Sequence, residues 1–306
     1  MPDADADAAT PSVARVETPW RRFAADFARS KLALAGLVLL GTILLLAALA
    51  PLIAPQDPYD LGVIDLMDSR LEPGSTSMSG ELVYRLGTDG QGRDMWSAIL
   101  YGLRVSLTVG VVSGLIALLI GGSLGILAAY AGGRFEQLLM RIVDIQLGFP
   151  AILVALILIA TLGKGVDKVI IALITVQWAY YARTARSAAL VERHKEYMEA
   201  ARGLGLGATR TILTHLVPNT LPPLIVVSTV QVAHAIALEA TLSFLGLGLP
   251  TTEPSLGLLI SNGYEFLLSG KYWISVYPGI ALLLTILSIN LVGDQLRDVL
   301  NPRLSR

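Results

Sequence analysis

The segment EYMEAARGLGLGATRTILTHLVPN, residues 196–219, is the most regularly patterned polar stretch of a very hydrophobic chain. Its first residues place Glu196, Glu199 and Arg202 at helical spacing, so the three share one face of a predicted helix. A helix this short is marginal in isolation and needs a surface to dock on. The pattern therefore predicts a short helix that is stabilised by contact with another surface.

Glycines follow this predicted helix at alternate positions, Gly203, Gly205 and Gly207. Glycine is the usual residue for ending a helix and reversing the chain. We expect a second helix to begin over Thr209–Val217 and to lead, at Pro218, into a long apolar run. The segment is thus predicted to be a helix–turn–helix connection between apolar runs.

The composition indicates a membrane protein. The 306 residues are 54% hydrophobic and only 15% charged, whereas soluble domains average about 25% charged. The net charge of −1 gives no indication of nucleic-acid binding. Cysteine is absent, which excludes disulfides and thiolate sites, and the presence of only three histidines argues against a multi-histidine metal site.

Six apolar runs are candidates for membrane spans, because a span needs about 20 mostly apolar residues. The runs are Leu32–Ala54, Val105–Ala131, Ile145–Gly163, Val169–Ala182, Leu216–Leu238 and Tyr272–Gly293. The sequence therefore predicts an all-α polytopic membrane protein with six transmembrane helices. Pro150 either kinks the third run or sits in its first turns, and Gly121 and Gly125 allow close helix packing in the second.

The distribution of Lys and Arg predicts the orientation. The N-terminal segment, the loops after the second and fourth runs and the C-terminal tail hold most of the 23 Lys and Arg residues. The positive-inside rule then places both termini and residues 196–219 in the cytoplasm. We expect a cytoplasmic tail over 1–30, a first helix and an external, folded loop over 31–104, and a core of five helices over 105–306 with a cytoplasmic loop at 192–218.

Residues 196–219 have two other interpretations. The first is a solvated cytoplasmic loop with a short amphipathic helix. The second is a nucleotide-binding loop, suggested by GLGLG at 203–207. That loop follows a helix and not a strand, and no GxxxxGK[ST] motif occurs anywhere. The chain is therefore not expected to bind or hydrolyse ATP itself.

Glu199-Ala200-Ala201, followed by Gly205 and then by Pro218, resembles the EAA loop of ABC importer permeases. His215 and Val217 depart from the usual I-x-L-P ending, but HLVPN at 215–219 resembles the peptide branch of that family. Further segments are similar to the C-type subunit of dipeptide and oligopeptide permeases: LGTDGQGRDMWSAILYG at 86–102, ALEATLSFLGLGLP at 237–250 and NLVGDQLRDVLNPRL at 290–304.

The resemblance implies a type I importer fold and a non-catalytic permease subunit in a bacterial inner membrane. Its implied partners are a second permease, two cytoplasmic ATPase subunits that bind ATP and Mg²⁺, and an external solute-binding protein, with short peptides as the substrate. No cofactor is implied in this chain. The residues implied to couple to an ATPase subunit are Glu196, Glu199, Ala200, Ala201, Arg202, Gly205 and Pro218.

Glu239 and His234 lie in or at the end of the fifth apolar run. Ionisable residues in a membrane span are functional candidates, so both are candidates for lining the translocation pathway or its gate. The alternative for each is an interhelical hydrogen bond that fixes packing. If instead they relay ions, the chain is an ion-coupled secondary transporter. A non-transporting scaffold and an exporter are further alternatives.

Overall fold

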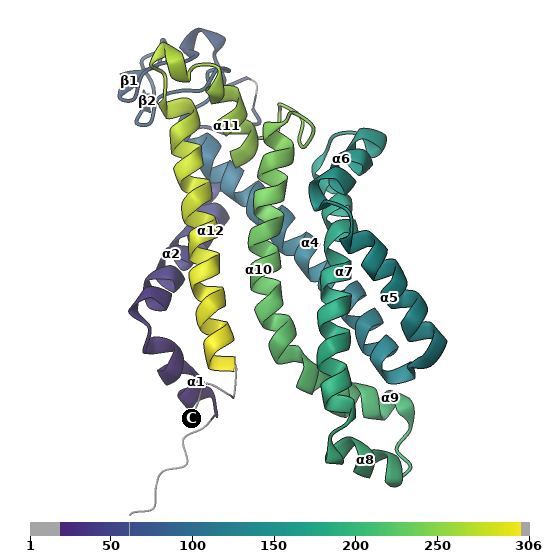
Figure 1. Cartoon of the computed structure of the whole chain (residues 1–306). Coiled ribbons are helices and arrows are strands. Elements are labelled where there is room, and N and C mark those ends of the chain that lie inside the picture. Colours follow the sequence, from purple (N-terminus) through teal and green to yellow (C-terminus); the bar gives the residue numbers. More distant parts are fainter. Residues whose placement is uncertain (1–18, 61, 301–306) are drawn as a thin grey trace, which may run out of the picture.

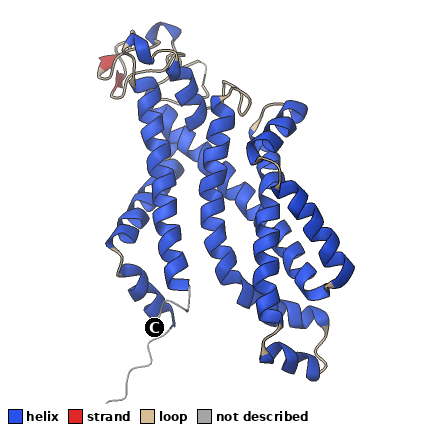
Figure 2. Cartoon of the chain, in the orientation of Figure 1, coloured by secondary structure: helices blue, strands red, loops and turns tan. Residues whose placement is uncertain are grey.

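The protein is described by a computed structural model that covers residues 19–60 and 62–300, in which most residues are helical (Figure 2). The long helices run beside one another, with a small cap at one end and the short helices α8 and α9 at the other, called here the α8 end (Figure 1). The helices are α1 (Pro19–Ala28), α2 (Lys31–Ala48), α3 (Ala50–Ile53), α4 (Met95–Ala131), α5 (Gly133–Leu147), α6 (Ala151–Leu162), α7 (Val166–Arg193), α8 (Glu196–Gly203), α9 (Ala208–Thr211), α10 (Val217–Phe244), α11 (Leu256–Tyr264) and α12 (Trp273–Leu300).

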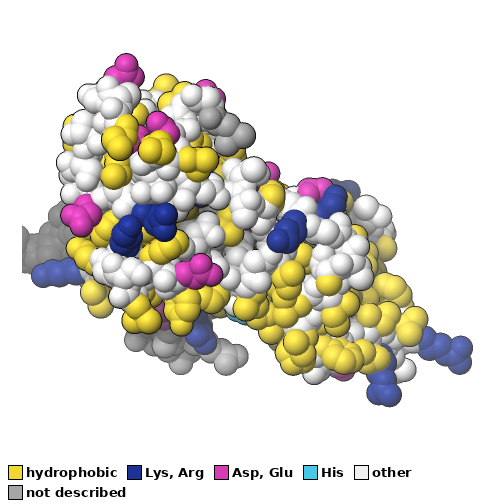
Figure 3. All heavy atoms as spheres, turned by 90° about the horizontal axis from the view of Figure 1, so that it is seen from above, with side chains coloured by type: hydrophobic (Ala, Val, Ile, Leu, Met, Phe, Trp, Pro, Cys, Tyr) yellow, Lys and Arg dark blue, Asp and Glu magenta, His cyan; other side chains and the backbone are white. Residues whose placement is uncertain are grey.

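Four of the described helices are long and apolar enough to cross a membrane, or five if the bent pair α5–α6 is one span. They are α2, α4, the continuous run Ala208–Phe244 that contains α10, and α12. Figure 3 shows hydrophobic side chains on the flanks of the molecule, as lipid contact requires. The predicted helical membrane protein is confirmed, whereas the predicted count of six spans is not. The fourth predicted span lies within α7, which carries charged residues toward both of its ends.

The third predicted span, Ile145–Gly163, is not one helix. It is divided between α5 and α6, whose axes are bent by 88° at the intervening residues. Pro150 precedes α6 with an extended ψ of 124°. Proline has no N–H for a helical bond, and it also disfavours helical geometry at the residue before it, Phe149. The structure therefore supports the first of the two interpretations of Pro150, a bend in the run, and shows that the helix is fully broken there.

Two other boundaries differ from the prediction. The second span was expected from Val105, but α4 begins at Met95, because Asp94 caps it by accepting a hydrogen bond from the Ser97 amide at 2.8 Å. At 37 residues, α4 is about 55 Å long. The first span, expected as Leu32–Ala54, divides into α2 and α3 next to Pro51.

Close packing of α4 against α7 forms much of the core. A Cβ atom added at Gly121 would lie 2.1 Å from the Trp178 carbonyl oxygen, and one at Gly125 would lie 2.3 Å from that of Ala182. These glycines therefore let the two backbones meet directly, as small residues do at membrane helix crossings. The GxxxG motif is used here for packing within the chain.

The cap includes the 3₁₀ turn η1 (Leu66–Asp68), the strands β1 (Ser75–Thr76) and β2 (Val83–Tyr84), and a second 3₁₀ turn η3 (Leu267–Ser269). The strands pair antiparallel. Tyr84 donates to the Asp68 carboxylate at 2.9 Å, and Thr88 donates to the Asp68 carbonyl oxygen. Trp273, at the start of α12, donates its indole N–H to the Thr88 carbonyl oxygen at 3.2 Å. The loop after the first span is therefore folded, as predicted.

The cap also contains a buried ion pair. Asp89 and Arg93 are each about 1% exposed, and Arg93 Nη2 lies 2.7 Å from Asp89 Oδ2. Burial of two charges is tolerated when they are paired and hydrogen-bonded. Asp89 also accepts from the backbone amides of Gln91 and Arg93. This pair ties the strand-to-helix turn before α4 into a fixed geometry.

The predicted N-terminal tail, 1–30, is only partly within the described residues. Its residues 1–18 lie outside them, whereas α1 is a helix that packs against α2 and α12. Gln295 of α12 donates to the Asp26 carbonyl oxygen at 3.2 Å. The described part of this segment is therefore attached to the bundle.

Candidate coupling segment and cavity

The short helix α8 is held against the rest of the chain at its start. Tyr197 donates its hydroxyl to one oxygen of Glu192 at 2.6 Å, and Lys195 donates to the other at 2.7 Å. Burial, and then the Glu192 carboxylate, raise the pKa of Tyr197 to about 12. The Tyr197 ring also lies 6.3 Å from that of His215. Tyr197 therefore connects the end of α7 to the segment that leads into α10.

One face of α8 is buried within the chain. Met198 is 0% exposed and packs with Ala189 of α7 and with Leu216. Ala201 is 4% exposed. Apolar side chains on one face of the helix supply the docking surface that so short a helix needs. The surface that stabilises α8 is therefore, in part, its own chain.

The glycine turn after α8 has the geometry of a helix C-terminus. Gly205 has a φ of +72°, in the left-handed region that favours glycine. The Leu206 amide donates to the Ala201 carbonyl oxygen at 3.1 Å, the long-range bond of a Schellman motif. Gly207 has an ordinary φ of −59°. Gly205 is thus the glycine whose conformation the turn requires.

The structure separates the predicted coupling residues into two groups. Glu196, Glu199 and Ala200 are exposed, as are Gly205 and, in the first turn of α10, Pro218. Ala201 faces inward. Arg202 lies in α8, and its side chain is outside the described part of the structure.

Leu204, next to the glycine turn, is 79% exposed, and Leu213 is 63% exposed. The sequence analysis did not select either leucine as a site residue. Both leucines lie in the connection between α8 and α10. Single exposed apolar side chains are common on protein surfaces, so their exposure alone does not identify a contact with a partner.

The connection from α9 to α10 is irregular. The chain forms a π-helical turn over Ile212–Leu216, called η2, and α10 then contains Pro222 and Pro223. Each proline removes one helical N–H donor. Asn219 donates its side-chain amide to the His215 carbonyl oxygen at 2.6 Å, which satisfies one group of this segment.

Glu239 is fully buried near the cap end of α10. It accepts hydrogen bonds from Ser106 of α4 and from Ser243, both at 2.8 Å. His234 is exposed on the same helix. Five residues of α-helix rotate the direction of the side chain by about 140° relative to the starting residue. The structure therefore does not bring Glu239 and His234 together.

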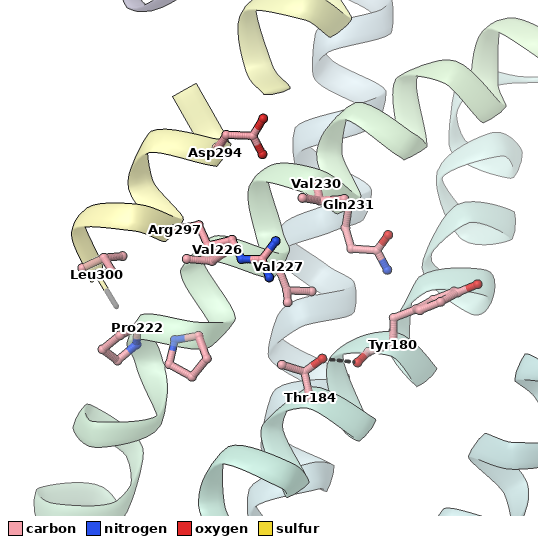
Figure 4. A pocket seen from close by; sticks show the side chains of 12 residues that line it. Tyr180, Thr184, Pro222, Val226, Val227, Val230, Gln231, Asp294, Arg297 and Leu300 are labelled. Atoms are coloured by element: carbon pink, nitrogen blue, oxygen red, sulfur yellow. Dashed lines mark hydrogen bonds between the residues drawn. The ribbon is translucent and has the colours of Figure 1, made fainter. Parts of the chain in front are cut away.

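A cavity of about 690 Å³ lies between α7, α10 and α12, toward the α8 end. Figure 4 shows side chains of all three helices around it. Its apolar wall comes mainly from α10, and its charged groups come from the end of α12. Polar or charged lining residues are Tyr180, Thr184, Gln231, Asp294 and Arg297; the apolar ones include Pro222, Pro223, Val226, Val227, Val230 and Leu300. The sequence analysis did not predict this cavity, because it is formed by three helices that are distant in sequence.

No group of three or more His, Cys, Asp or Glu side chains that could hold a metal ion occurs among the described residues.

The fold resembles that of a solved ABC transporter. The inward-facing MetNI methionine ABC transporter gives a TM-score of 0.57 at 21% identity, and the alignment covers 68% of this chain and 98% of that chain. At this level of identity the likeness concerns the fold alone.

Sequence comparisons are more specific. The family model described as binding-protein-dependent transport system inner membrane component matches residues 121–306, and the N-terminal TM domain of oligopeptide transport permease C matches 18–73. A putative peptide transport system permease of Brucella suis is 42% identical over 88% of this chain and 87% of that protein. The di/tripeptide permease DppC of Pseudomonas aeruginosa is 37% identical over 98% of this chain and 97% of that protein. The dipeptide permease DppC of Escherichia coli K12 is 39% identical over 94% and 95%, respectively. The chain belongs to the family of binding-protein-dependent transport system inner membrane components, the permease subunits of ABC importers.

Proposed function

We propose that this chain is one of two permease subunits in an ATP-driven importer of dipeptides or other short peptides in a bacterial inner membrane. The single observation that carries the substrate assignment is the similarity to peptide permeases along nearly the whole chain, 37% over 98% of it in one case. A second permease, two ATPase subunits that bind ATP and Mg²⁺, and an external solute-binding protein complete the transporter. The chain itself supplies no catalytic residue.

The arrangement of α8 supports a role in coupling. Its exposed face carries Glu196, Glu199 and Ala200, and Leu204 projects at its tip. Its opposite face is fixed to α7 and to the start of α10 through Tyr197 and Met198. We infer that an ATPase subunit holds the exposed face, so that closure of the ATPase dimer moves α8 together with α7 and α10. Such a movement produces alternating access by rocking of packed helices.

The proposal includes six spans with both termini in the cytoplasm. In this arrangement the bent pair α5–α6 crosses as the third span, and α7 returns as the fourth. At 12 residues, α6 is about 18 Å long and too short to cross the hydrocarbon alone, so part of α5 completes the crossing. The α8 end is then cytoplasmic and the cap is external.

The comparisons give no support to the alternative of an ion-coupled secondary transporter. The separation of Glu239 from His234 by the width of α10 also argues against a direct relay between them.

The experiment that tests the proposed function is purification of the tagged chain from its native membrane in a mild detergent, followed by uptake of labelled dialanine in proteoliposomes. We expect a second permease and one or two kinds of ATPase subunit to copurify. We expect uptake to require ATP and an added binding protein. Uptake driven by an ion gradient without ATP would refute the proposal, as would isolation of the chain alone where a control ABC complex remains intact.

A further inference from the structure

Asp294 and Arg297 line the cavity as two opposite charges on one helix. Both side chains are exposed, and in the described part of the chain neither forms an ion pair or a side-chain hydrogen bond. Asp and Arg three residues apart on a helix are close enough to form an ion pair. In Figure 4 the Asp294 carboxylate and the Arg297 guanidinium instead extend separately from α12, the guanidinium toward α10.

Some of the other charges on the helices of this half of the molecule have partners, whereas others, such as Arg141 of α5 and Asp298 of α12, form no ion pair among the described residues. Asp144 of α5 pairs with Arg183 of α7, and Glu136 pairs with Arg186. Lys195 pairs with Glu192 before α8. Asp294 and Arg297 therefore differ from these groups in facing a cavity without a protein counter-ion among the described residues.

The cavity has the size and chemistry for a small zwitterion. Its volume of about 690 Å³ lies within the range of about 300–1,000 Å³ that is typical of small-molecule sites. Side chains at i and i+3 begin roughly 5–6 Å apart, and the ends of an extended dipeptide are roughly 7 Å apart. Val226, Val227 and Val230 form an apolar wall for side chains, and Gln231 provides both a donor and an acceptor for a peptide group.

We propose that Asp294 receives the ammonium group, and Arg297 the carboxylate group, of a short peptide that occupies this cavity. This inference rests on the proposed function, because it assumes that peptides pass along this face of the chain. The contacts are weak, since both charges are exposed to water. Weak binding suits a pathway from which the substrate has to leave.

The test uses the assembled complex in lipid nanodiscs, without ATP and without the binding protein. Binding of dialanine, N-acetyl-dialanine and dialanine amide is measured by ligand-observed NMR. In the wild type we expect each blocked peptide to bind roughly fivefold more weakly than dialanine, as for an exposed ion pair. In Asp294→Asn, acetylation of dialanine should no longer weaken its binding, whereas amidation should still do so; the loss of affinity on blocking an end is called the penalty below. In Arg297→Gln, amidation should no longer weaken binding, whereas acetylation should still do so.

Two exposed charges outside the cavity provide controls, Asp298 on the same helix and Arg141 on α5. Asp298→Asn and Arg141→Gln should keep both penalties. If either cavity variant fails to assemble, Asp294→Ala or Arg297→Ala replaces it and should lose the same penalty as the variant that it replaces. Assembly is checked by size-exclusion chromatography.

The inference is overturned if dialanine shows no binding at millimolar concentrations, if blocking either end has no effect, or if the cavity variants respond as the controls do. The same preparation is assayed for ATP-dependent uptake with the binding protein added. If ATP-dependent uptake occurs but the NMR binding assay shows no difference between free and blocked peptides, the inference alone is refuted. If ATP-dependent uptake is absent, the proposed function is refuted.

Discussion

At the scale of single residues, Glu239 shows how a carboxyl group is accommodated inside a membrane bundle. It is fully buried and lies between the hydroxyls of Ser106 and Ser243. A polar group in such surroundings has to be hydrogen-bonded. Since Ser106 belongs to α4, the contact joins two helices, and we infer that Glu239 fixes their register.

Substitutions at Glu239 separate packing from a charged role. Glu239→Gln keeps an acceptor for the serines, so its free energy of unfolding should lie within about 1 kcal/mol of the wild-type value, and it should retain uptake. Glu239→Leu leaves both hydroxyls without this partner and should lower the free energy of unfolding by about 1–3 kcal/mol. Thermal unfolding in detergent and uptake in proteoliposomes measure the two effects. Loss of uptake in a stable Glu239→Gln variant would show that the charge itself is needed.

Gly205 is the residue whose backbone conformation a side chain disturbs most directly in the coupling segment. Gly205→Val places a β-branched residue at a φ of +72°, at a cost of about 1–2 kcal/mol. We expect ATP hydrolysis to continue while uptake per ATP falls severalfold. Gly207→Val is the matched control, because Gly207 has equal space around it but an ordinary φ. Equal coupling in the two variants would contradict a role for the turn geometry.

At the scale of helices, the contact between α4 and α7 depends on glycine more than on apolar bulk. Gly121→Ala and Gly125→Ala each force a Cβ atom against a backbone carbonyl of α7, and backbone is less able to move aside than a flexible side chain. Each should lower stability by about 1–3 kcal/mol, the usual cost of overpacking. Gly279→Ala in α12 is the control, since no atom lies within 4 Å of the added Cβ. Unfolding of all three variants at the same temperature would show that α4 and α7 separate readily.

Helices were predicted from the sequence more successfully than their ends and breaks. Apolar runs predicted α2, α4, α10 and α12, because burial in lipid is a property of composition. The run Ile145–Gly163 looked continuous because Gly148, Phe149 and Pro150 are individually compatible with a span. Its break depends on the backbone at Pro150 and on the packing of α5 beside α7, which composition does not encode.

The candidate site was also predictable only in part. The EAA pattern located α8 and its glycine turn. It did not show that Ala201 faces the chain itself, because helical spacing defines faces but not which face is covered. The sequence analysis did not select the cavity residues Asp294 and Arg297, because they are distant in sequence from the residues of α7 and α10 that line the same cavity.

At the scale of the whole molecule, the arrangement of spans can be tested by chemical labelling, because the chain has no cysteine. Single cysteines are introduced at Met78 in the cap, Lys164 between α6 and α7, and Leu204 beside α8, all exposed positions. In intact spheroplasts an impermeant thiol reagent should label the first two positions and spare Leu204→Cys until the membrane is opened. Protection of Lys164→Cys would show that the bent pair α5–α6 turns back without crossing.

The hydrogen bond between Trp273 and Thr88 joins residues that lie 185 positions apart in the chain. The cap therefore lacks this hydrogen bond until α12 has been synthesised and inserted. At ordinary rates of translation, about 5–20 residues per second, the ribosome needs roughly 10–40 s to cover that interval. In the proposed orientation, the first loop lies outside the membrane during this time without its contact to α12. Completion of the cap then requires that the whole permease has been made and inserted.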